Sequence, residues 1–152
     1  MAASAWQLYN EAKYYIGNGT ITLGAGVFKM VLLKSASNTS TFTLSTYAQL
    51  TNEVATAAGY VAGGRALVPA TGQWVQGASA KQQKFTMSAI GIAFTASGAN
   101  IADIKFAVLR NSVSSGIGKV LCWCKLSSSQ FTVATPNTLT VLPAATGIFT
   151  LT

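Results

Sequence analysis

The stretch YAQLTNEVATAAGYVAGGRAL, residues 47–67, is the part of the sequence around which we expect the fold to be organised. Gly63 and Gly64 form a pair that can turn the chain at positive φ, where a side chain would clash. Glu53, one of only three acidic residues, precedes this pair, and Arg65 follows it. We therefore predict a fixed loop held by a local charge-assisted contact. The alternative is a flexible connector in which the acid and the arginine never meet.

Three segments of the chain carry a resemblance to one known family. LTNEV (50–54) followed by GYVAGGRAL (59–67) is similar to a recurring Asn-Glu-Val, Gly-Tyr and Gly-Gly-x-Ala-Leu series. GNGTITL (17–23), leading into FKMVLL (28–33), resembles an opening element, and ATGIFTLT (145–152) resembles a closing one. The family is that of small structural proteins of tailed bacteriophages, and residues 73–130 are less typical of it. The resemblance implies a virion component, assembled in the host cytoplasm, and no particular chemistry.

Length and composition favour one domain with a low-charge surface. The chain has 152 residues, enough for a single hydrophobic core, and only 9% of them are charged. A surface rich in Ser, Thr, Gly and Asn costs little to desolvate when other subunits cover it. The mean hydropathy is +0.41. However, the apolar runs near 27–33 and 119–126 are too short for a membrane span and contain lysines.

The charge balance favours an anionic partner. Ten basic and three acidic residues give a formal net charge of +7 and a pI near 9.7. The basic residues are spread singly along the chain, and only Lys81 and Lys84 come close together. No basic run with interleaved aromatic residues is present, so we expect no specific binding of nucleic acid. An acidic protein surface explains the same charge, and the family resemblance suggests the capsid shell as that surface.

The sequence offers little for catalysis. It contains no histidine, the usual general base at neutral pH, and Glu11, Glu53 and Asp103 lie far apart. The glycine pairs are not followed by the Gly-Lys-Ser/Thr of a phosphate-binding loop.

Two cysteines, Cys122 and Cys124, stand in a Cys-x-Cys pattern. We interpret them as buried thiols on one face of a core strand, because this spacing suits neither a relaxed disulfide nor a zinc site. We expect a protein that is not an enzyme and has no cofactor or metal.

The N-terminal segment has two interpretations. Trp6, Tyr9 and Ile16 fall near helical spacing, and Gly17 ends the pattern. We predict a short helix or an extended arm over residues 1–18, followed by a single β-sandwich domain over 19–152. The aromatic side chains, Tyr14 among them, either cover the domain's own core or form an arm that docks on a neighbour.

Most of the remaining chain has strand character. We predict an all-β fold, an antiparallel β-sandwich, and prefer a jelly roll by analogy with virion proteins. Residues 35–43 should form an exposed loop and residues 46–50 a helical turn. The predicted strands are 20–23, 27–34, 60–66, 84–95, 104–110, 119–126, 131–134, 138–142 and 147–152.

Two functions remain open. The first is a capsid decoration or cement protein that binds the major capsid protein and neighbouring virion subunits, and that forms a homo-oligomer, either a dimer or a trimer. The second is a tail, neck or head-fibre-associated protein with a role in host recognition, in which Trp74, Tyr47 and Asn111 would line a sugar site. The candidate interface residues are Trp6, Tyr9, Tyr14, Tyr60, Arg65 and Trp74.

Overall fold

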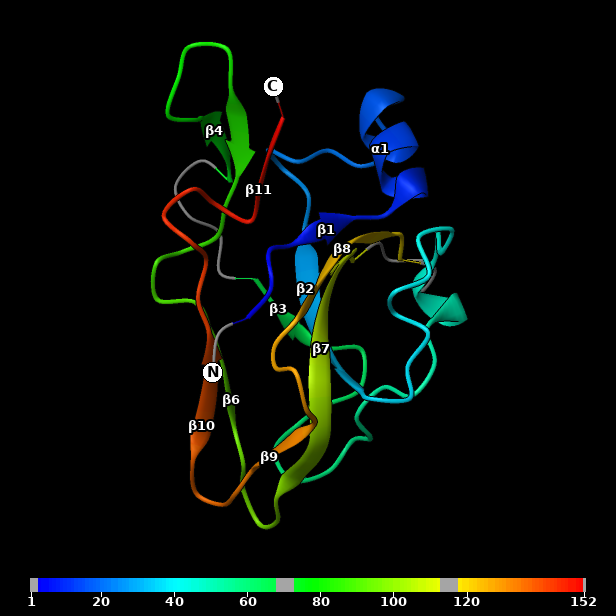
Figure 1. Ribbon diagram of the computed structural model, residues 1–152, viewed down its shortest axis with the longest axis vertical. Coiled ribbons are helices and arrows are strands. Elements are labelled where there is room, and N and C mark those ends of the chain that lie inside the picture. The colour runs from blue at the N-terminus through cyan, green and yellow to red at the C-terminus, as the bar shows by residue number, and fades with distance from the viewer. Residues whose placement is uncertain (1–2, 68–72, 113–117, 152) are drawn as a thin grey trace.

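The computed structural model describes residues 3–67, 73–112 and 118–151 of the chain. They form an all-β sandwich of antiparallel sheets with one short α-helix (Figure 1). The larger sheet has the order β1 (Gln7–Leu8), β8 (Val120–Lys125), β7 (Ile101–Asn111), β2 (Phe28–Lys34) and β3 (Arg65–Ala66), and β9 (Phe131–Val133) also pairs with β7.

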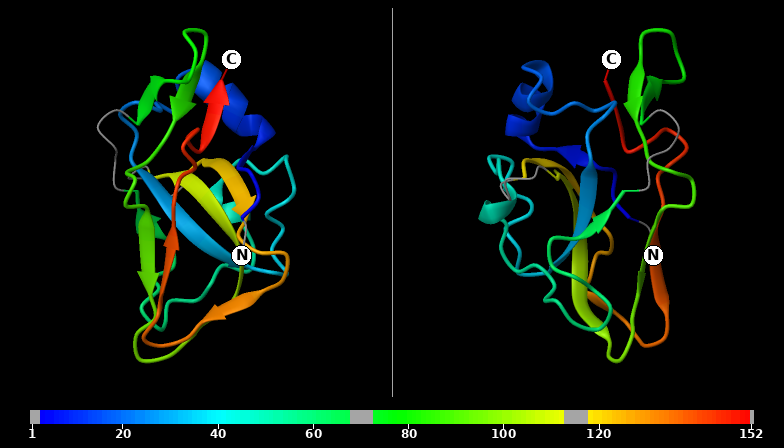
Figure 2. Two further views of the ribbon diagram at one scale, coloured as in Figure 1. Left: turned by 60° about the vertical axis from the view of Figure 1, so that its left-hand side comes forward. Right: turned by 180° about the vertical axis from the view of Figure 1, so that it is seen from behind.

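Two small sheets form the second layer. One consists of β6 (Ile92–Thr95) and β10 (Thr138–Val141), and the other of β4 (Trp74–Gln76), β5 (Gln83–Phe85) and β11 (Phe149–Leu151). Seen from behind, they lie across from β2 and β7 (Figure 2). The helix α1 (Asn10–Gly17) and the 3-10 turn η1 (Tyr47–Gln49) belong to none of the three sheets. Within the described ranges, no helix has the length and apolarity needed to span a bilayer.

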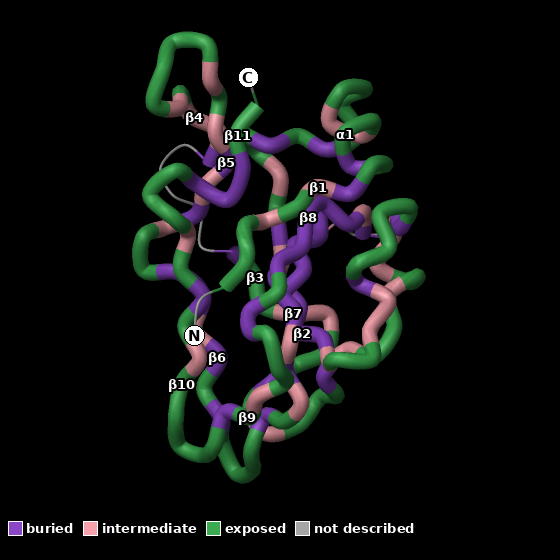
Figure 3. Tube along the Cα trace, in the orientation of Figure 1, coloured by how far each residue is buried: buried purple, intermediate pink, exposed green. Residues whose placement is uncertain are grey.

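The core is centred on β2, β7 and β8. All residues of β2 except Lys29 and Lys34 are buried, and in β8 only Lys125 is exposed (Figure 3). A strand covered on both faces reads as a continuous apolar run rather than an alternating one, which explains the sequence pattern here. The predictions for 27–34, 104–110 and 119–126 are confirmed. Cys122 and Cys124 are buried and free, as predicted.

Several other elements also follow the prediction. The helical turn expected at 46–50 is η1, and the strands expected at 131–134, 138–142 and 147–152 are β9, β10 and β11. Of the region 60–66, only Arg65–Ala66 forms a ladder. The loop at 35–43 is confirmed as a loop, but it is not wholly exposed, because Thr39 is completely buried. The Ser/Gly-rich segment 111–118, for which the sequence also predicts a loop, lies largely outside the described residues.

Two strand predictions are wrong. Residues 20–23 alternate as a strand would, and Ile21 and Leu23 are buried, but the segment has no ladder partner in the described chain. Residues 84–95 do not form one strand: β5 ends at Phe85 and β6 begins at Ile92. Between them Gly91 adopts φ +73° and its N–H bonds to the carbonyl of Ser88, which turns the chain from one small sheet to the other.

The N-terminal segment belongs to the sandwich. β1 extends the larger sheet by pairing with β8, and Tyr9 and Ala12 are completely buried. The helix begins at Asn10, later than predicted, because residues 7–8 are held in the ladder. The jelly-roll topology is not confirmed: the described residues form sheets of six, two and three strands with the order given above.

Candidate functional site

The carboxylate of Glu53 lies at the centre of a hydrogen-bond network built from the 47–67 stretch. Glu53 Oε1 accepts from the Tyr60 hydroxyl at 2.7 Å and from the Gly63 N–H at 2.7 Å. Its Oε2 accepts from the Tyr47 hydroxyl. The backbone of this segment is also attached to the larger sheet, because Glu53 forms an isolated bridge with Leu33. The prediction of a fixed loop is confirmed, but the donors to the Glu53 carboxylate are two tyrosine hydroxyls and a backbone N–H.

The arginine that binds this loop is Arg110, not Arg65. Arg110 Nε and Nη2 donate to the Gly63 carbonyl at 3.1 and 2.8 Å, and the guanidinium lies 4.3 Å from the centre of the Tyr47 ring. Arg65 instead donates from Nη1 to the Ala93 carbonyl at 2.6 Å. The expected contact between Glu53 and Arg65 is therefore wrong. Glu53 therefore binds the N–H, and Arg110 the carbonyl, of the same residue, Gly63, which adopts φ +92°.

The network is suited to holding the loop rather than to catalysis. Burial first, and then the hydrogen bond to Glu53, raise the pKa of Tyr47 to about 12. The same two causes raise the pKa of Tyr60 well above its usual value.

The two cysteines lie outside this network. Burial raises the pKa of the Cys124 thiol to about 12 and that of the Cys122 thiol above its usual range, so both thiols stay protonated and weakly nucleophilic. The described residues bring together no group of three His, Cys, Asp or Glu side chains that could hold a metal ion.

A cavity of about 380 Å³ lies beside this network, bounded by β3, β6 and the 59–64 turn. Phe94 and the buried Tyr60 form apolar walls, and Val61, 65% exposed, stands at the opening. Lys29 and Arg65 line the same cavity. Two cations beside an apolar hollow can recognise a group that is apolar at its centre and anionic around it. We call this feature the Lys29–Arg65 pocket.

A second, more open hollow of about 900 Å³ lies between residues 3–8 and residues 142–150. It separates β1 and β11, which are terminal strands of different sheets. Phe42 and Leu142 line it with exposed fractions of 42% and 59%. Apolar surface next to sheet edges is a feature of contact surfaces between proteins.

The six predicted interface residues have different surroundings. Tyr9 and Tyr60 are buried by the chain's own core, at 0% and 2% exposure, and are not available for a surface contact. Tyr14 is 64% exposed on α1, and Trp6 lines the hollow between β1 and β11. Only Arg65 combines exposure with a pocket, since the partly buried Trp74 packs against Phe149 in the second layer.

The residues of the suggested sugar site do not form an exposed cluster. The Tyr47 ring lies beneath Arg110 and its hydroxyl is bonded to Glu53. Asn111 is buried at 7% exposure. Tyr47 and Asn111 therefore do not join Trp74 in an exposed sugar site.

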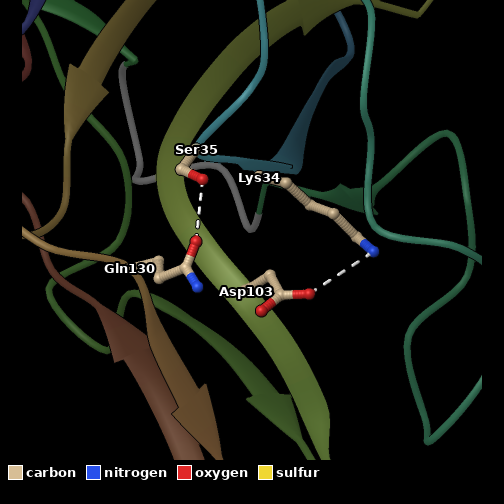
Figure 4. A network of polar contacts seen from close by, with 4 residues as sticks. All are labelled: Lys34, Ser35, Asp103 and Gln130. Carbon is tan, nitrogen blue, oxygen red and sulfur yellow. Dashed lines mark hydrogen bonds and ion pairs between the residues drawn. The ribbon is translucent and has the colours of Figure 1, made fainter.

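Most cations of the chain have no acidic partner. All charged side chains lie in the described ranges, and among them the one ion pair joins Lys34 Nζ to Asp103 at 3.8 Å. Figure 4 shows this pair beside the 2.8 Å hydrogen bond from Ser35 to Gln130, at the end of β2. Both partners of the pair are more than a third exposed, so it adds little stability.

Sequence reasoning missed Arg110, Lys29 and Phe94 as members of these sites. Arg110 had a visible signal, because it ends the apolar run FAVLR in a core strand, where an arginine needs buried partners. Lys29 and Phe94 had none, since each lies in an ordinary strand pattern far in sequence from Arg65. Comparison of the chain with family models, curated proteins and solved structures finds no match in any of the three.

Proposed function

We propose that this chain is a non-enzymatic structural protein of a tailed-phage virion, a decoration or cement protein that binds the major capsid protein. The observation that carries the proposal is the charge distribution. Of ten cationic side chains, only Lys34 forms an ion pair among the described residues. Such an excess leaves a positive field that steers the protein to an acidic surface. The resemblance of the 50–67 segment to phage structural proteins supports the capsid shell as that surface.

Binding would stabilise the shell by mass action. A protein that binds only the assembled lattice shifts the equilibrium toward that lattice, and no chemical step is needed. Because only 9% of the residues of the chain are charged, its surface is inexpensive to cover. Repeated lattice positions favour closed symmetric oligomers, so the proposal includes a dimer or trimer.

Co-sedimentation with capsid shells that lack this protein tests the proposal. We expect saturable binding, on the order of hundreds of copies per shell, as for a subunit that follows the lattice. Binding should weaken as salt rises from about 0.05 to 0.5 M, because contacts between exposed charges are screened. A basic protein of similar size and unrelated fold serves as the control for non-specific adsorption.

Two results would contradict the decoration role. Binding of about a dozen copies or fewer would place the protein at a vertex, neck or tail, where the lattice offers few equivalent positions. That result would favour the alternative function in host recognition. Binding no tighter than the basic control would reduce the charge argument to non-specific attraction.

A further inference from the structure

The Lys29–Arg65 pocket has the character of a binding site for a peptide. Its cavity of about 380 Å³ falls within the range of ordinary ligand pockets and is large enough for one aliphatic or aromatic side chain. Phe94 and Tyr60 are 3% and 2% exposed, so they present a fixed apolar wall rather than mobile surface. Val61 extends this apolar surface outward at the opening.

The geometry of the walls is fixed by three hydrogen bonds of two lining residues, Arg65 and Tyr60. Arg65 Nη1 donates to the Ala93 carbonyl of β6, which joins the edge of the larger sheet to the edge of a small sheet. The Tyr60 hydroxyl is bonded to Glu53 and accepts the Leu32 N–H at 3.1 Å. The pocket is therefore formed before any ligand arrives, which lowers the entropic cost of binding.

The charges around the pocket have one sign. Lys29 and Arg65 line it, and neither forms an ion pair in the described chain. Arg65 uses Nη1 for Ala93, which leaves the other nitrogens of its guanidinium for a ligand. The nearby carboxylate of Glu53 is occupied by Tyr47, Tyr60 and Gly63, so it does not neutralise either cation by direct contact.

The backbone at the pocket favours an extended peptide over a lipid or a small anion. β3 is the terminal strand of the larger sheet, so no strand among the described residues pairs with its outer edge. The Leu67 N–H donates to the Phe28 carbonyl, and in an antiparallel ladder alternate residues point in opposite directions. The N–H and C=O of Ala66 therefore point away from β2, to the side where an added strand would pair.

We infer that the Lys29–Arg65 pocket receives an apolar side chain of an acidic, extended segment of a partner protein. The apolar side chain fills the cavity between Phe94 and Tyr60. The flanking carboxylates reach Lys29 and Arg65, and the segment's backbone pairs with Ala66. In assigning that segment to the major capsid protein, the inference rests on the proposed function.

The test uses three synthetic peptides and the full chain. The probe is the acetylated, amidated peptide Glu-Asp-Leu-Asp-Glu. The first control peptide replaces Leu by Ser, and the second replaces the acids by their amides. Binding is followed by amide chemical shifts of the protein up to about 5 mM peptide, a range that detects millimolar affinity. We expect saturable shifts at Lys29, Arg65 and Ala66 with the probe, and at least about tenfold weaker binding of each control.

Two pairs of protein variants test the location. Val61→Asp puts a carboxylate at the opening and should weaken probe binding at least about tenfold, since it competes for the cations and repels the peptide. Val27→Asp changes a valine of similar exposure, 59%, outside the pocket and should leave binding within about twofold. Lys29→Gln should weaken binding several-fold, whereas Lys125→Gln, on an exposed site of β8, should not. Thermal unfolding confirms that each variant is folded.

The outcomes separate this inference from the proposed function. No shifts at the pocket, equal binding of all three peptides, or unchanged binding by Val61→Asp would overturn the inference. If wild-type protein saturates the shells and Val61→Asp does so equally well, the pocket is not the contact and the decoration role remains. If the peptide binds at the pocket but wild-type protein does not bind shells, the pocket remains and its assignment to the capsid fails.

Discussion

The hydroxyl of Tyr60 donates to Glu53 Oε1 at 2.7 Å and accepts the Leu32 N–H at 3.1 Å. One buried side chain thus joins the 53–63 loop to the central strand β2. Because Glu53 also accepts from Tyr47 and Gly63, its carboxylate fixes the loop at three points. The wall of the Lys29–Arg65 pocket depends on this arrangement, since Tyr60 belongs to both.

Replacing Glu53 should destabilise the fold far more than replacing another acid. Glu53→Ala removes the acceptor of three donors and should lower the free energy of unfolding by about 3 kcal/mol, because hydrogen bonds to charged groups are strong and the donors are left unpaired. Glu53→Gln keeps one oxygen acceptor and should cost less. Glu11→Ala, in the exposed first turn of α1, should change stability by about 0.5 kcal/mol or less. Urea unfolding measures all three, and equal effects at Glu53 and Glu11 would contradict the network.

The free energy of unfolding should fall at alkaline pH because the Tyr47 hydroxyl loses its proton. Its pKa is raised from 10.0 to about 12 in the folded protein, first by burial and then by the hydrogen bond to Glu53. The folded state therefore holds this proton more tightly than the unfolded chain. Its contribution to stability is complete below pH 10 and is lost as the pH rises through about 12.

Urea unfolding at a series of pH values checks this dependence. The Tyr47→Phe variant should lose less stability than the wild type between pH 10 and 12, since the lysines are common to both proteins. Parallel profiles for the two proteins would show that Tyr47 does not contribute to the pH dependence.

Two glycines with similar backbone angles should respond differently to alanine. Gly64 has φ +80°, and a Cβ there would overlap the Met30 carbonyl of β2. Gly98 has φ +75°, and nothing lies within 4 Å of its Cβ position. Gly98→Ala should cost about 1 kcal/mol of unfolding free energy for the left-handed conformation alone. Gly64→Ala should cost at least about 3 kcal/mol, because the strand backbone must also shift. Similar melting temperatures of the two variants would contradict the close packing of the turn against β2.

Two tyrosines of the N-terminal segment should also differ in how strongly their replacement by alanine destabilises the protein. Tyr9 is completely buried and its hydroxyl donates to the Thr39 carbonyl at 2.9 Å, whereas Tyr14 is 64% exposed. Tyr9→Ala should lower the unfolding free energy by about 4 kcal/mol, as for other large-to-small core changes. Tyr14→Ala should change it by less than about 0.5 kcal/mol. Thermal and urea unfolding test both, and a stable Tyr9→Ala protein would mean that the segment is a separable arm.

The prediction of β2, β7 and β8 succeeded because each strand has a continuous apolar centre that can be recognised without its neighbours. The same holds for Cys122 and Cys124, whose burial follows from the strand around them. Gly63 and Gly64 were recognised as a turn at positive φ, because that conformation is a property of glycine itself.

Where local pattern and pairing disagreed, the prediction failed. Residues 20–23 alternate like a strand, but a ladder needs a neighbouring edge, and none of the described strands provides it. The run 84–95 has strand character throughout, yet the turn that ends at Gly91 divides it between two sheets. Propensity describes each residue's preference, whereas hydrogen-bond partners come from distant parts of the chain.

By itself, the sequence determined the all-β class, the central strands, the glycine turn and the positive charge, since these depend on residue type and short-range pattern. Only the tertiary structure decided which side chains meet. Glu53 meets Tyr47 and Tyr60 rather than Arg65, and Lys29 and Phe94 come together from different sheets. Such contacts depend on strand order and register, which bring residues far apart in the chain within a few ångströms and which no short segment encodes.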